Sequence, residues 1–492
     1  MLVRDVLRKL DLGSSVAEFD ASLEKYFVDT QTSRDVVQGR ADVVAGDKGT
    51  GKTALFRILM ARENTYPELA NVAILPAFNV SGSPIFQRLT ESEPLDEAGY
   101  NSVWKTYILA FVGHYLLKKE TGKEQDKDLQ LIERILANAD LRSLDDMPLS
   151  VFGRIAEWAR KKFAATKSAG VDLGMPKGPS IKPHLEFAPD NSGGAPIRFE
   201  EALAVLDRAL AARNLSCWVV LDRLDEAFQG APAVEIPALR ALLRVFLDLM
   251  AFQHIRLKLF VRRDLFRKVV EGGFVNLTHV NARKVEIAWD EDDLKNLLCQ
   301  RIRENPDFLG IIGLAKNSTN DAIVAAVFPE KVDVGERKST TWSWLMSRIR
   351  DGNGLKPPRN LIDLVKKAQD AQIRREEREE NAYEQGNPLI GADALKRGLS
   401  SLSEDRVNDT LLAKLGVYAN LIQKFRDGKA EHNEATLAET LGVVPGEVRK
   451  HAKHLCELGF LEQVGEGESY KIPILYRDGL NVTQGKAFAA KE

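Results

Sequence analysis

Short apolar runs alternate with amphipathic stretches over the first 290 residues of the chain. The strand-like runs are ADVVAG (41–46), NVAILPAFNV (71–80), CWVVLD (217–222) and IRLKLFVR (255–262). Between them, TALFRILMAR (53–62) and FEEALAVLDRALAARN (199–214) carry apolar residues at helical spacing. Pro76 cannot donate a ladder hydrogen bond, which disfavours a central place for its strand. The alternation predicts an α/β fold with a largely parallel sheet that is covered by helices on both faces.

The pattern elsewhere is helical, apart from one segment at 167–197 that is dense in Gly, Pro, Ser and Asp. That composition is typical of a loop, a loose hairpin or a disordered insert. The predicted domains are an N-terminal helical lead-in at 1–40, a core at 41–289, a helical lid and linker at 290–404, a winged helix-turn-helix at 405–480 and a tail at 481–492. Within the core we expect a helical insertion at about 94–165 and the flexible insert at 167–197.

Composition narrows the class of protein without identifying it. The 492 residues are 44% hydrophobic and 28% charged with a net charge of −2, which is typical of a globular protein and indicates no general affinity for nucleic acid. Cys217, Cys299 and Cys456 are far apart, which disfavours a disulfide framework or a zinc site. The polar start MLVRDVLRKLDLG and the lack of a long apolar run predict a cytoplasmic protein without a membrane segment.

The segment GDKGTGKT (46–53) fits the phosphate-loop pattern G-x-x-x-x-G-K-[ST]. It follows a predicted strand and opens a predicted helix, so glycines can turn backbone N–H groups toward phosphate oxygens at a helix N-terminus. Lys52 would reach the β and γ phosphates, and the Thr53 hydroxyl would bind Mg²⁺. The predicted nucleotide-binding residues of this loop are Gly46, Asp47, Lys48, Gly49, Thr50, Gly51, Lys52, Thr53 and Ala54. The alternative, a chance match in a turn, is disfavoured by the flanking elements and by an acidic strand farther on.

That acidic strand is VVLDRLDEAF (219–228). In P-loop nucleotidases a second strand beside the phosphate loop ends in an aspartate that holds Mg²⁺, and Asp222 has this position. Asp225 and Glu226 both remain candidates for the general base that activates water, with Lys52 stabilising phosphate charge. Arg223 would help these acids to stay ionised. Capping of the next helix is the structural alternative for Asp222 and Asp225.

The segment DRLDE (222–226) resembles the D-G-x-D-E motif of signal-transduction ATPases with numerous domains, the STAND class, and is similar to that of KAP-type bacterial ATPases, both related to the AAA+ proteins. Further similar segments are SSVAEFDASLEKYFVDT, KLFVRRDLF, HVNARKVEIAWDEDDLKNLLCQRI and GLKPPRNLIDLVKKAQ, so the resemblance covers roughly residues 10 to 370. It implies ATP as the nucleotide, Mg²⁺ as the metal, Asp222 as the magnesium ligand and Asp225 with Glu226 as the trailing acids. Arg223 stands where the STAND motif commonly has glycine.

The same resemblance implies two arginine sensors. Arg262, with Arg263 as the alternative, corresponds to the arginine that senses the γ phosphate, although a surface ion pair with Asp264 explains an arginine there equally well. Arg359 follows two prolines at the start of a predicted helix and corresponds to a lid residue that touches nucleotide. Its alternative is a role in helix packing.

The C-terminal segment from His432 to Tyr476 reads as helix, glycine turn, helix and a two-stranded wing with GEGE at its tip. Val448, Ala452, Leu455 and Leu458 form its apolar stripe, and Arg449, Lys450, Lys453 and His454 would face outward. Residues 406–492 contain 12 Lys and Arg and 12 Asp and Glu, so the net charge is 12 − 12 = 0. This neutrality and the acidic tip disfavour DNA contact relative to a packing or protein-partner role.

Together these features predict an ATPase that acts as a nucleotide-dependent switch on a protein partner or on its own assembly. The family resemblance extends this prediction to bacterial defence or signalling. The alternative is a nucleotide-binding, DNA-associated regulator that uses the winged helix. We find no convincing nuclease constellation.

Overall fold

A computed structural model describes residues 1–63, 65–77, 95–122, 126–139, 141, 197–224, 232–413, 417–465 and 469–488, together with the backbone of the short strand 186–187. The chain forms two compact units. We call residues 29–47 and 52–287 the sheet unit, and residues 1–28, 48–51 and 288–492 the helical unit. The part of the predicted helical insertion after residue 141, most of the insert 167–197, Asp225, Glu226 and the last four residues lie outside the described residues.

The sheet unit is built on five parallel strands in the order β2-β5-β6-β1-β7. They are β1 (Val43–Gly46), β2 (Val72–Pro76), β5 (Ser216–Leu221), β6 (Ile255–Arg262) and β7 (Lys284–Glu286). Its helices are α3 (Gln31–Val37), α4 (Lys52–Ala61), α6 (Glu97–Lys119), α7 (Lys127–Asn138), α9 (Phe199–Ala211), α11 (Pro232–Leu249), α12 (Arg263–Val270) and α13 (Leu277–Ala282). The predicted α/β fold with a parallel sheet is therefore confirmed.

Pro76 ends β2, which is an edge strand of the sheet. An edge position tolerates the missing N–H donor, as the sequence indicated. The acidic strand β5 is not the neighbour of β1, because β6 lies between them. The expectation that the acidic strand lies directly beside the strand of the phosphate loop is therefore wrong, since one strand separates them. The carboxyl ends of the parallel strands nevertheless share one edge of the sheet, which is where both motifs lie.

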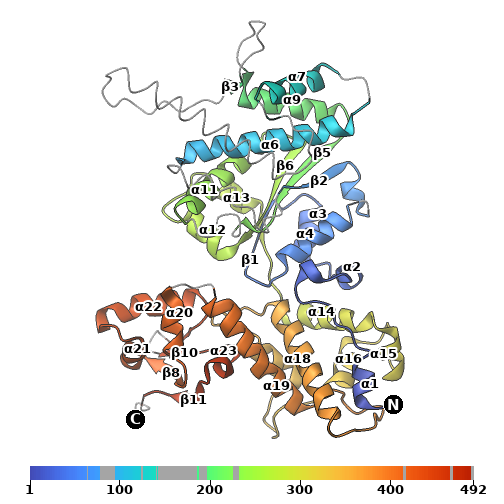
Figure 1. The fold of residues 1–492 in the computed structure, drawn as a ribbon, viewed down its shortest axis with the longest axis vertical. Coiled ribbons are helices and arrows are strands. Elements are labelled where there is room, and N and C mark those ends of the chain that lie inside the picture. Colours follow the sequence, from blue (N-terminus) through green and yellow to red (C-terminus); the bar gives the residue numbers. More distant parts are fainter. Residues whose placement is uncertain are drawn as a thin grey trace. The chain divides into compact units, whose positions relative to one another are not determined.

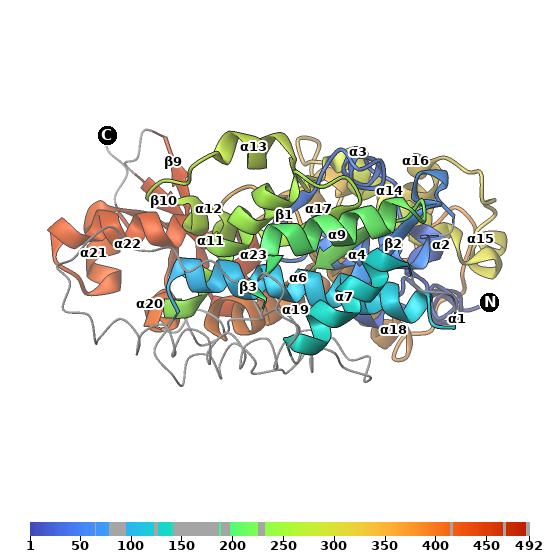
Figure 2. The same ribbon diagram turned by 90° about the horizontal axis from the view of Figure 1, so that it is seen from above.

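Alternate residues of the strands point to opposite faces of the sheet. Val219, Leu257 and Leu259 belong to the core shared with α6, α9 and α11, three helices that lie side by side in both views (Figure 1, Figure 2). Phe260 points to the other face and meets Phe56 of α4 edge-on, with ring centroids 6.1 Å apart. Both faces are covered, which explains why these strands read as nearly continuous apolar runs.

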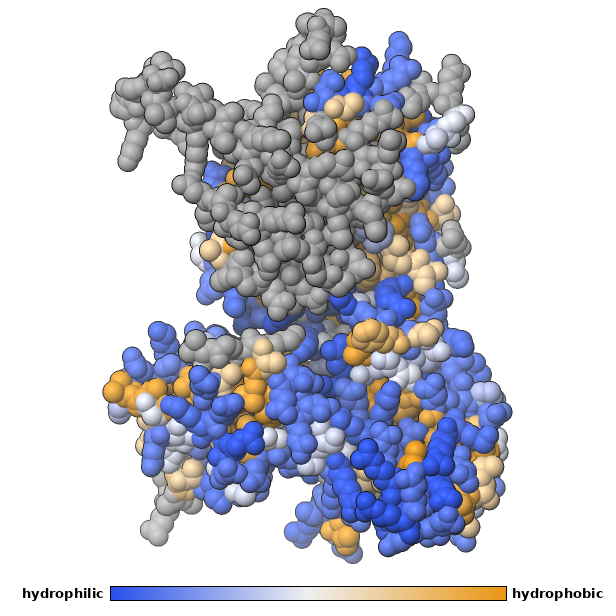
Figure 3. Space-filling view, in the orientation of Figure 1, coloured by the Kyte–Doolittle hydropathy of each residue, from blue (hydrophilic) through white to orange (hydrophobic). Residues whose placement is uncertain are grey.

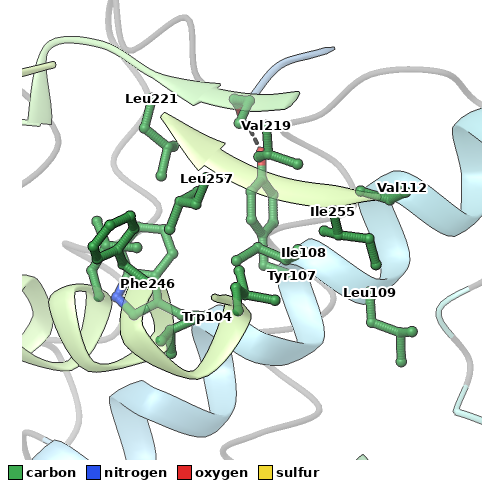
Figure 4. Close-up of a cluster of buried hydrophobic side chains, with 14 of the residues drawn as sticks. Trp104, Tyr107, Ile108, Leu109, Val112, Val219, Leu221, Phe246, Ile255 and Leu257 are labelled. Atoms are coloured by element: carbon green, nitrogen blue, oxygen red, sulfur yellow. Dashed lines mark hydrogen bonds between the residues drawn. The ribbon is translucent and has the colours of Figure 1, made fainter. Parts of the chain in front are cut away.

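The largest side chains of this core come from α6 (Figure 4). Trp104 and Tyr107 are fully buried, and each polar group finds a backbone partner. The Trp104 indole donates to the Ala238 carbonyl over 2.9 Å, and the Tyr107 hydroxyl donates to the Ala77 carbonyl. Buried aromatic residues of this kind add a large apolar area while their polar tips stay satisfied.

The helical unit begins with α1 (Val3–Leu7) and α2 (Leu23–Tyr26) and continues through α14 (Glu291–Arg303), α15 (Pro306–Ile311), α16 (Asn320–Val327), α17 (Thr341–Arg348), α18 (Pro358–Glu376) and α19 (Ala392–Asp405). α18 begins at Pro358, as the two prolines before Arg359 indicated. The side-chain amide of Gln369 on α18 donates to the carbonyls of Leu7 and Leu10, each over 2.8 Å. The N-terminal residues therefore pack within the helical unit. The domain limits predicted from the sequence remain predictions.

The C-terminal part forms the predicted winged helix. Its elements are a π-helical turn (Arg406–Leu412), α20 (Val417–Gln423), β8 (Lys429–Asn433), α21 (Glu434–Leu441), α22 (Pro445–Glu457), β9 (Glu462–Val464), β10 (Ser469–Lys471), α23 (Ile474–Arg477) and β11 (Thr483–Lys486). Gly442 has φ 62° at the turn between α21 and α22, the conformation that glycine adopts readily. The strands form a sheet in the order β11-β8-β10-β9, of which the sequence indicated only the β9–β10 wing.

The apolar stripe of α22 has the predicted orientation. Val448, Ala452 and Leu455 are buried, and Leu458 is half-buried just after the helix. Residues 466–468 of the wing tip lie outside the described residues. Within the part of the chain that the structure describes, no helix combines the length and apolarity needed to cross a membrane.

Candidate functional site

The phosphate loop connects β1, which ends at Gly46, to α4, which begins at Lys52. Gly49 has φ 80° and Gly51 has φ 102°, backbone conformations that glycine reaches without the steric cost of a side chain. Successive N–H groups in such a turn form a concave donor surface that suits phosphate oxygens. The local sequence therefore explains the loop, since its glycines stand at the two positions with positive φ.

The Lys52 ammonium lies against the loop itself. Its Nζ donates to the carbonyls of Gly46 over 2.8 Å and Asp47 over 2.9 Å. The lysine thereby holds its charge at the concave side of the loop, where it would meet phosphate oxygens. Ala54 is the third residue of α4 and follows Thr53 into the helix.

Thr53 and Asp222 are brought together although 169 positions separate them in the sequence. Thr53 Oγ1 donates to Asp222 Oδ2 over 3.0 Å, and Asp222 is 4% exposed. A hydroxyl and a carboxylate are the hard oxygen ligands that Mg²⁺ prefers, with the remaining ligands supplied by phosphate and water. No group of three His, Cys, Asp or Glu residues able to hold a metal ion occurs in the described ranges.

Asp225 and Glu226, the two candidates for water activation, lie outside the described residues, so their roles remain predictions. Arg223, directly after Asp222, has φ 55°. This is the left-handed region, which costs an L-residue with a side chain roughly 1–2 kcal/mol. Arg223 therefore adopts a glycine-like backbone at the position where the STAND motif has glycine.

The two adjacent arginines at the end of β6 and the start of α12 have different partners. Arg262 pairs with Asp264, with Nε–Oδ1 at 3.0 Å and Nη2–Oδ2 at 2.7 Å, which is the ion pair considered from the sequence. Arg263 instead approaches the phosphate loop, with Nε at 3.5 Å from Asp47 Oδ2, and its Nη2 is 3.1 Å from Glu286. Burial raises the pKa of Asp47, and the Arg263 guanidinium opposes that shift. Of the two arginines, Arg263 contacts the predicted nucleotide loop.

This placement follows from strand register. Gly46 of β1 pairs with Arg262 of β6, so the residue after each strand reaches the same edge of the sheet. Arg263, the first residue of α12, therefore lies next to Asp47. In open α/β sheets, ligands bind at this carboxyl edge.

Residues 48–51 of the loop belong to the helical unit and contact other residues of it. The Trp289 indole donates to the Thr50 carbonyl over 2.8 Å. A Cβ added to Gly49 would lie 3.2 Å from Cβ of Arg359 and 3.5 Å from Cβ of Pro357. The predicted lid residue Arg359 is thus in contact range of the loop backbone.

Trp289 was not singled out as a site residue by the sequence. A single tryptophan before an acidic helix start has no motif that marks it, and only its contact with Thr50 reveals the connection. Lys48 and Thr50 stand at variable positions of the phosphate-loop pattern and are among the predicted nucleotide-binding residues, and Thr50 is buried. Gly49 and Thr50 are therefore positioned by contacts with Arg359 and Trp289 as well as by the backbone freedom of the loop glycines.

Comparisons with known proteins show similarity at low identity. No family model and no curated protein matches the chain. Among solved structures, the Aeropyrum pernix ORC1 protein in complex with DNA is 13% identical, with 95% of this chain and 96% of that chain covered and a TM-score of 0.36. The Aeropyrum pernix ORC2 protein, in ADPNP-ADP complexes, is 14% identical, with 94% and 97% covered and a TM-score of 0.43. At such low scores neither likeness bears on the function of this chain.

Proposed function

We propose that this chain binds ATP with Mg²⁺ at residues 46–53 and hydrolyses it, and that the nucleotide state acts as a switch on a protein partner or on self-assembly. The observation that best supports this proposal is the 3.0 Å contact between Thr53 Oγ1 and Asp222 Oδ2 at the end of a glycine-rich phosphate loop. A chance motif match would not require these two oxygens to meet.

In this proposal each group has a separate task. Backbone N–H groups of the loop and the Lys52 ammonium bind the phosphates, and Thr53 with Asp222 holds the metal, which supplies charge neutralisation when bound. Asp225 or Glu226 positions and deprotonates the attacking water. Arg263 or Arg262 would sense the γ phosphate, and the contact of Arg263 with Asp47 favours the former.

The switch is supported by the packing of the loop within the helical unit. Thr50 is bound by Trp289, and Gly49 lies against Arg359 at the start of α18. A phosphate group that pulls the loop N–H groups inward would act directly on these two contacts. A conformational change in the helical unit is the expected response.

ATP turnover and size-exclusion chromatography, each with and without ATP and Mg²⁺, test the proposal on wild type and variants. Lys52→Ala should weaken ATP binding by about 10- to 100-fold, because charged hydrogen bonds contribute about 1.5–3 kcal/mol. Thr53→Val should remove the Mg²⁺-dependent part of binding, whereas Thr53→Ser should retain it. Glu226→Gln and Asp225→Asn should separate tight binding from slow turnover and identify the general base. Absence of ATP binding by the wild type would disprove the proposal.

The alternative is a nucleotide-binding regulator that contacts DNA through α22. Lys450 and Lys453 are exposed on this helix, and Arg449 pairs with Glu434 over 2.7 Å. Those exposed cations are the observation in its favour. Salt-dependent binding of duplex DNA that is lost in Arg449→Ala/Lys453→Ala would support it, and DNA binding that survives the double substitution would exclude this helix. A place in bacterial defence or signalling rests on the family resemblance alone.

A further inference from the structure

A cavity of about 270 Å³ lies inside the helical unit, between α17, the loop after it and the winged helix. Its basic and hydroxyl-bearing lining residues are Ser343, Ser347, Arg350, Lys356, Lys471 and Arg477. Two acids, Glu291 and Glu462, also line it, so the four cations exceed the acids by two charges. The visible surface of this unit is largely hydrophilic, but charge gathered in a hollow acts more strongly than charge on an open surface (Figure 3).

Arg477 is the unusual member of this lining. It is 7% exposed, its Nε donates to the Ile472 carbonyl over 2.8 Å and its Nη1 donates to Gln484. Its Nη2 is buried and makes no hydrogen bond to any residue in the described part of the chain. A buried donor without an acceptor is destabilising, and more so when it carries charge. An anion in the cavity would supply the missing acceptor.

The lysines of the cavity retain donor capacity. Lys356 Nζ lies 2.6 Å from Glu291, and Lys471 Nζ lies 3.4 Å from Glu431. Their side chains are 24% and 35% exposed, so both ammonium groups are accessible. An ammonium has three donors, and one carboxylate does not use them all. Arg350 is bound to Glu462 through both carboxylate oxygens and forms part of the wall.

We propose that this cavity binds a small phosphate-bearing molecule, with the phosphate or pyrophosphate group held by Lys356, Lys471 and Arg477. Ammonium, guanidinium and hydroxyl donors that converge from several directions suit the several oxygens of a phosphate better than a flat carboxylate. The volume lies just under the 300–1,000 Å³ range of drug-sized sites, which fits a compact anion. A nucleic-acid strand cannot reach a guanidinium that is almost fully buried.

Binding here would connect two parts of the helical unit. Ser343 and Ser347 belong to α17, and Lys356 precedes α18 by two residues. Lys471 and Arg477 belong to the winged helix. A bound anion would therefore stabilise the attachment of the winged helix to the elements that lead into α18. This site is independent of the proposed ATP site.

The test uses the full chain with Lys52→Ala as background, which weakens phosphate binding at the loop, and it assigns to the cavity only the binding that the cavity variants reduce. Sodium pyrophosphate is titrated by calorimetry, and thermal unfolding is followed in pyrophosphate and in sodium chloride of equal ionic strength. We expect one binding site and a higher melting temperature in pyrophosphate. Lys356→Gln/Lys471→Gln should weaken binding at least tenfold, whereas Lys471→Arg should retain most of it.

The matched control is Lys453→Gln/Lys486→Gln, which removes the same charge from exposed positions of the winged helix. It should bind pyrophosphate as the background protein does. Equal weakening in both double variants would show a general charge effect and overturn the proposal. Failure of pyrophosphate to bind, or binding of duplex DNA without pyrophosphate binding, would also overturn it. Because only binding that the cavity variants reduce is assigned to the cavity, the outcome does not depend on whether the phosphate loop binds ATP.

Discussion

Arg262 and Arg263 are neighbours in the sequence but have different surroundings. Arg262 is bound to Asp264 two residues away, whereas Arg263 spans the distance to Asp47 in the phosphate loop and to Glu286 on β7. An ion pair within one turn needs no particular fold. A contact between the ends of two strands exists only in the folded chain.

We predict that Arg263→Ala reduces ATP turnover at least tenfold, because it removes a cation beside the predicted γ-phosphate position. Arg262→Ala is the comparison and should change turnover less than Arg263→Ala does, since the Arg262–Asp264 ion pair is partly exposed and does not involve the phosphate loop. Steady-state ATP hydrolysis measures both. The reverse order would make Arg262 the sensor and reduce Arg263 to an ion pair.

Lys258 is a buried charge inside the sheet unit. Its Nζ lies 2.8 Å from Asp42 Oδ1, 2.6 Å from the Ala41 carbonyl and 3.9 Å from the centre of the Trp218 ring. Burial lowers the pKa of Lys258 to about 8, with Asp42 opposing the shift. Between pH 8 and its ordinary value of 10.5, the unfolded chain therefore carries a proton on this lysine that the folded chain lacks.

The contribution of Lys258 to the unfolding free energy therefore increases with pH between pH 8 and 10.5, because the unfolded state binds more protons in that range. We predict that the unfolding free energy of wild type, relative to Lys258→Met, increases by roughly 2 kcal/mol from pH 7.5 to pH 10. Urea unfolding at the two pH values measures it. Cysteines and tyrosines titrate in both proteins and cancel in the difference. A pH-independent difference would show that Lys258 keeps its ordinary pKa.

Among the secondary-structure elements, the phosphate loop between β1 and α4 has three features that fix its conformation. Its glycines allow the turn, Lys52 binds its carbonyls, and Trp289, just before α14, binds Thr50. The first two constraints are encoded within eight residues. The third is a hydrogen bond to Thr50 from a tryptophan 239 positions away, so it exists only when that part of the chain is folded.

We predict that Trp289→Phe weakens ATP binding about fivefold, because it removes one hydrogen bond worth about 1 kcal/mol while it keeps an aromatic ring. Trp342→Phe is the control, since the Trp342 indole nitrogen has no hydrogen-bond partner among the described residues of the chain. It should leave binding unchanged. Equilibrium binding of a fluorescent ATP analogue measures both, and equal effects would contradict a specific role for Trp289.

At the scale of the whole molecule, the N-terminal residues complete the helical unit. Arg301 on α14 forms an ion pair with Asp20 over 3.1 Å, and its guanidinium lies 4.3 Å from the ring centre of Tyr26. Asp20 and Arg301 are both buried. The N-terminal segment and α14 thus meet in one polar cluster.

We predict that Arg301→Met lowers the unfolding free energy by about 3–5 kcal/mol, because it leaves the Asp20 carboxylate buried without its cation. Arg303→Met, at a half-buried position of the same helix, removes bonds to the Ser318 carbonyl and to Asn320 and should cost about 1 kcal/mol. Urea unfolding compares them. Similar costs would indicate that Asp20 is stabilised by Tyr26 and backbone donors instead.

The amino-acid sequence was sufficient to predict the features that depend on adjacent residues. The phosphate loop, the apolar strands, the helix start at Pro358 and the turn at Gly442 follow from local spacing and backbone preference, and the parallel sheet follows from their alternation.

The two motifs also predicted that Asp222 and Thr53 share one magnesium site, and these side chains do lie together. The other long-range placements came from the fold: β6 between β1 and β5, Arg263 at the loop, Trp289 on Thr50 and Arg477 in a basic cavity. Strand order and register set these contacts, and no local pattern encodes them, because each joins residues whose separation in the chain carries no information about their distance in space.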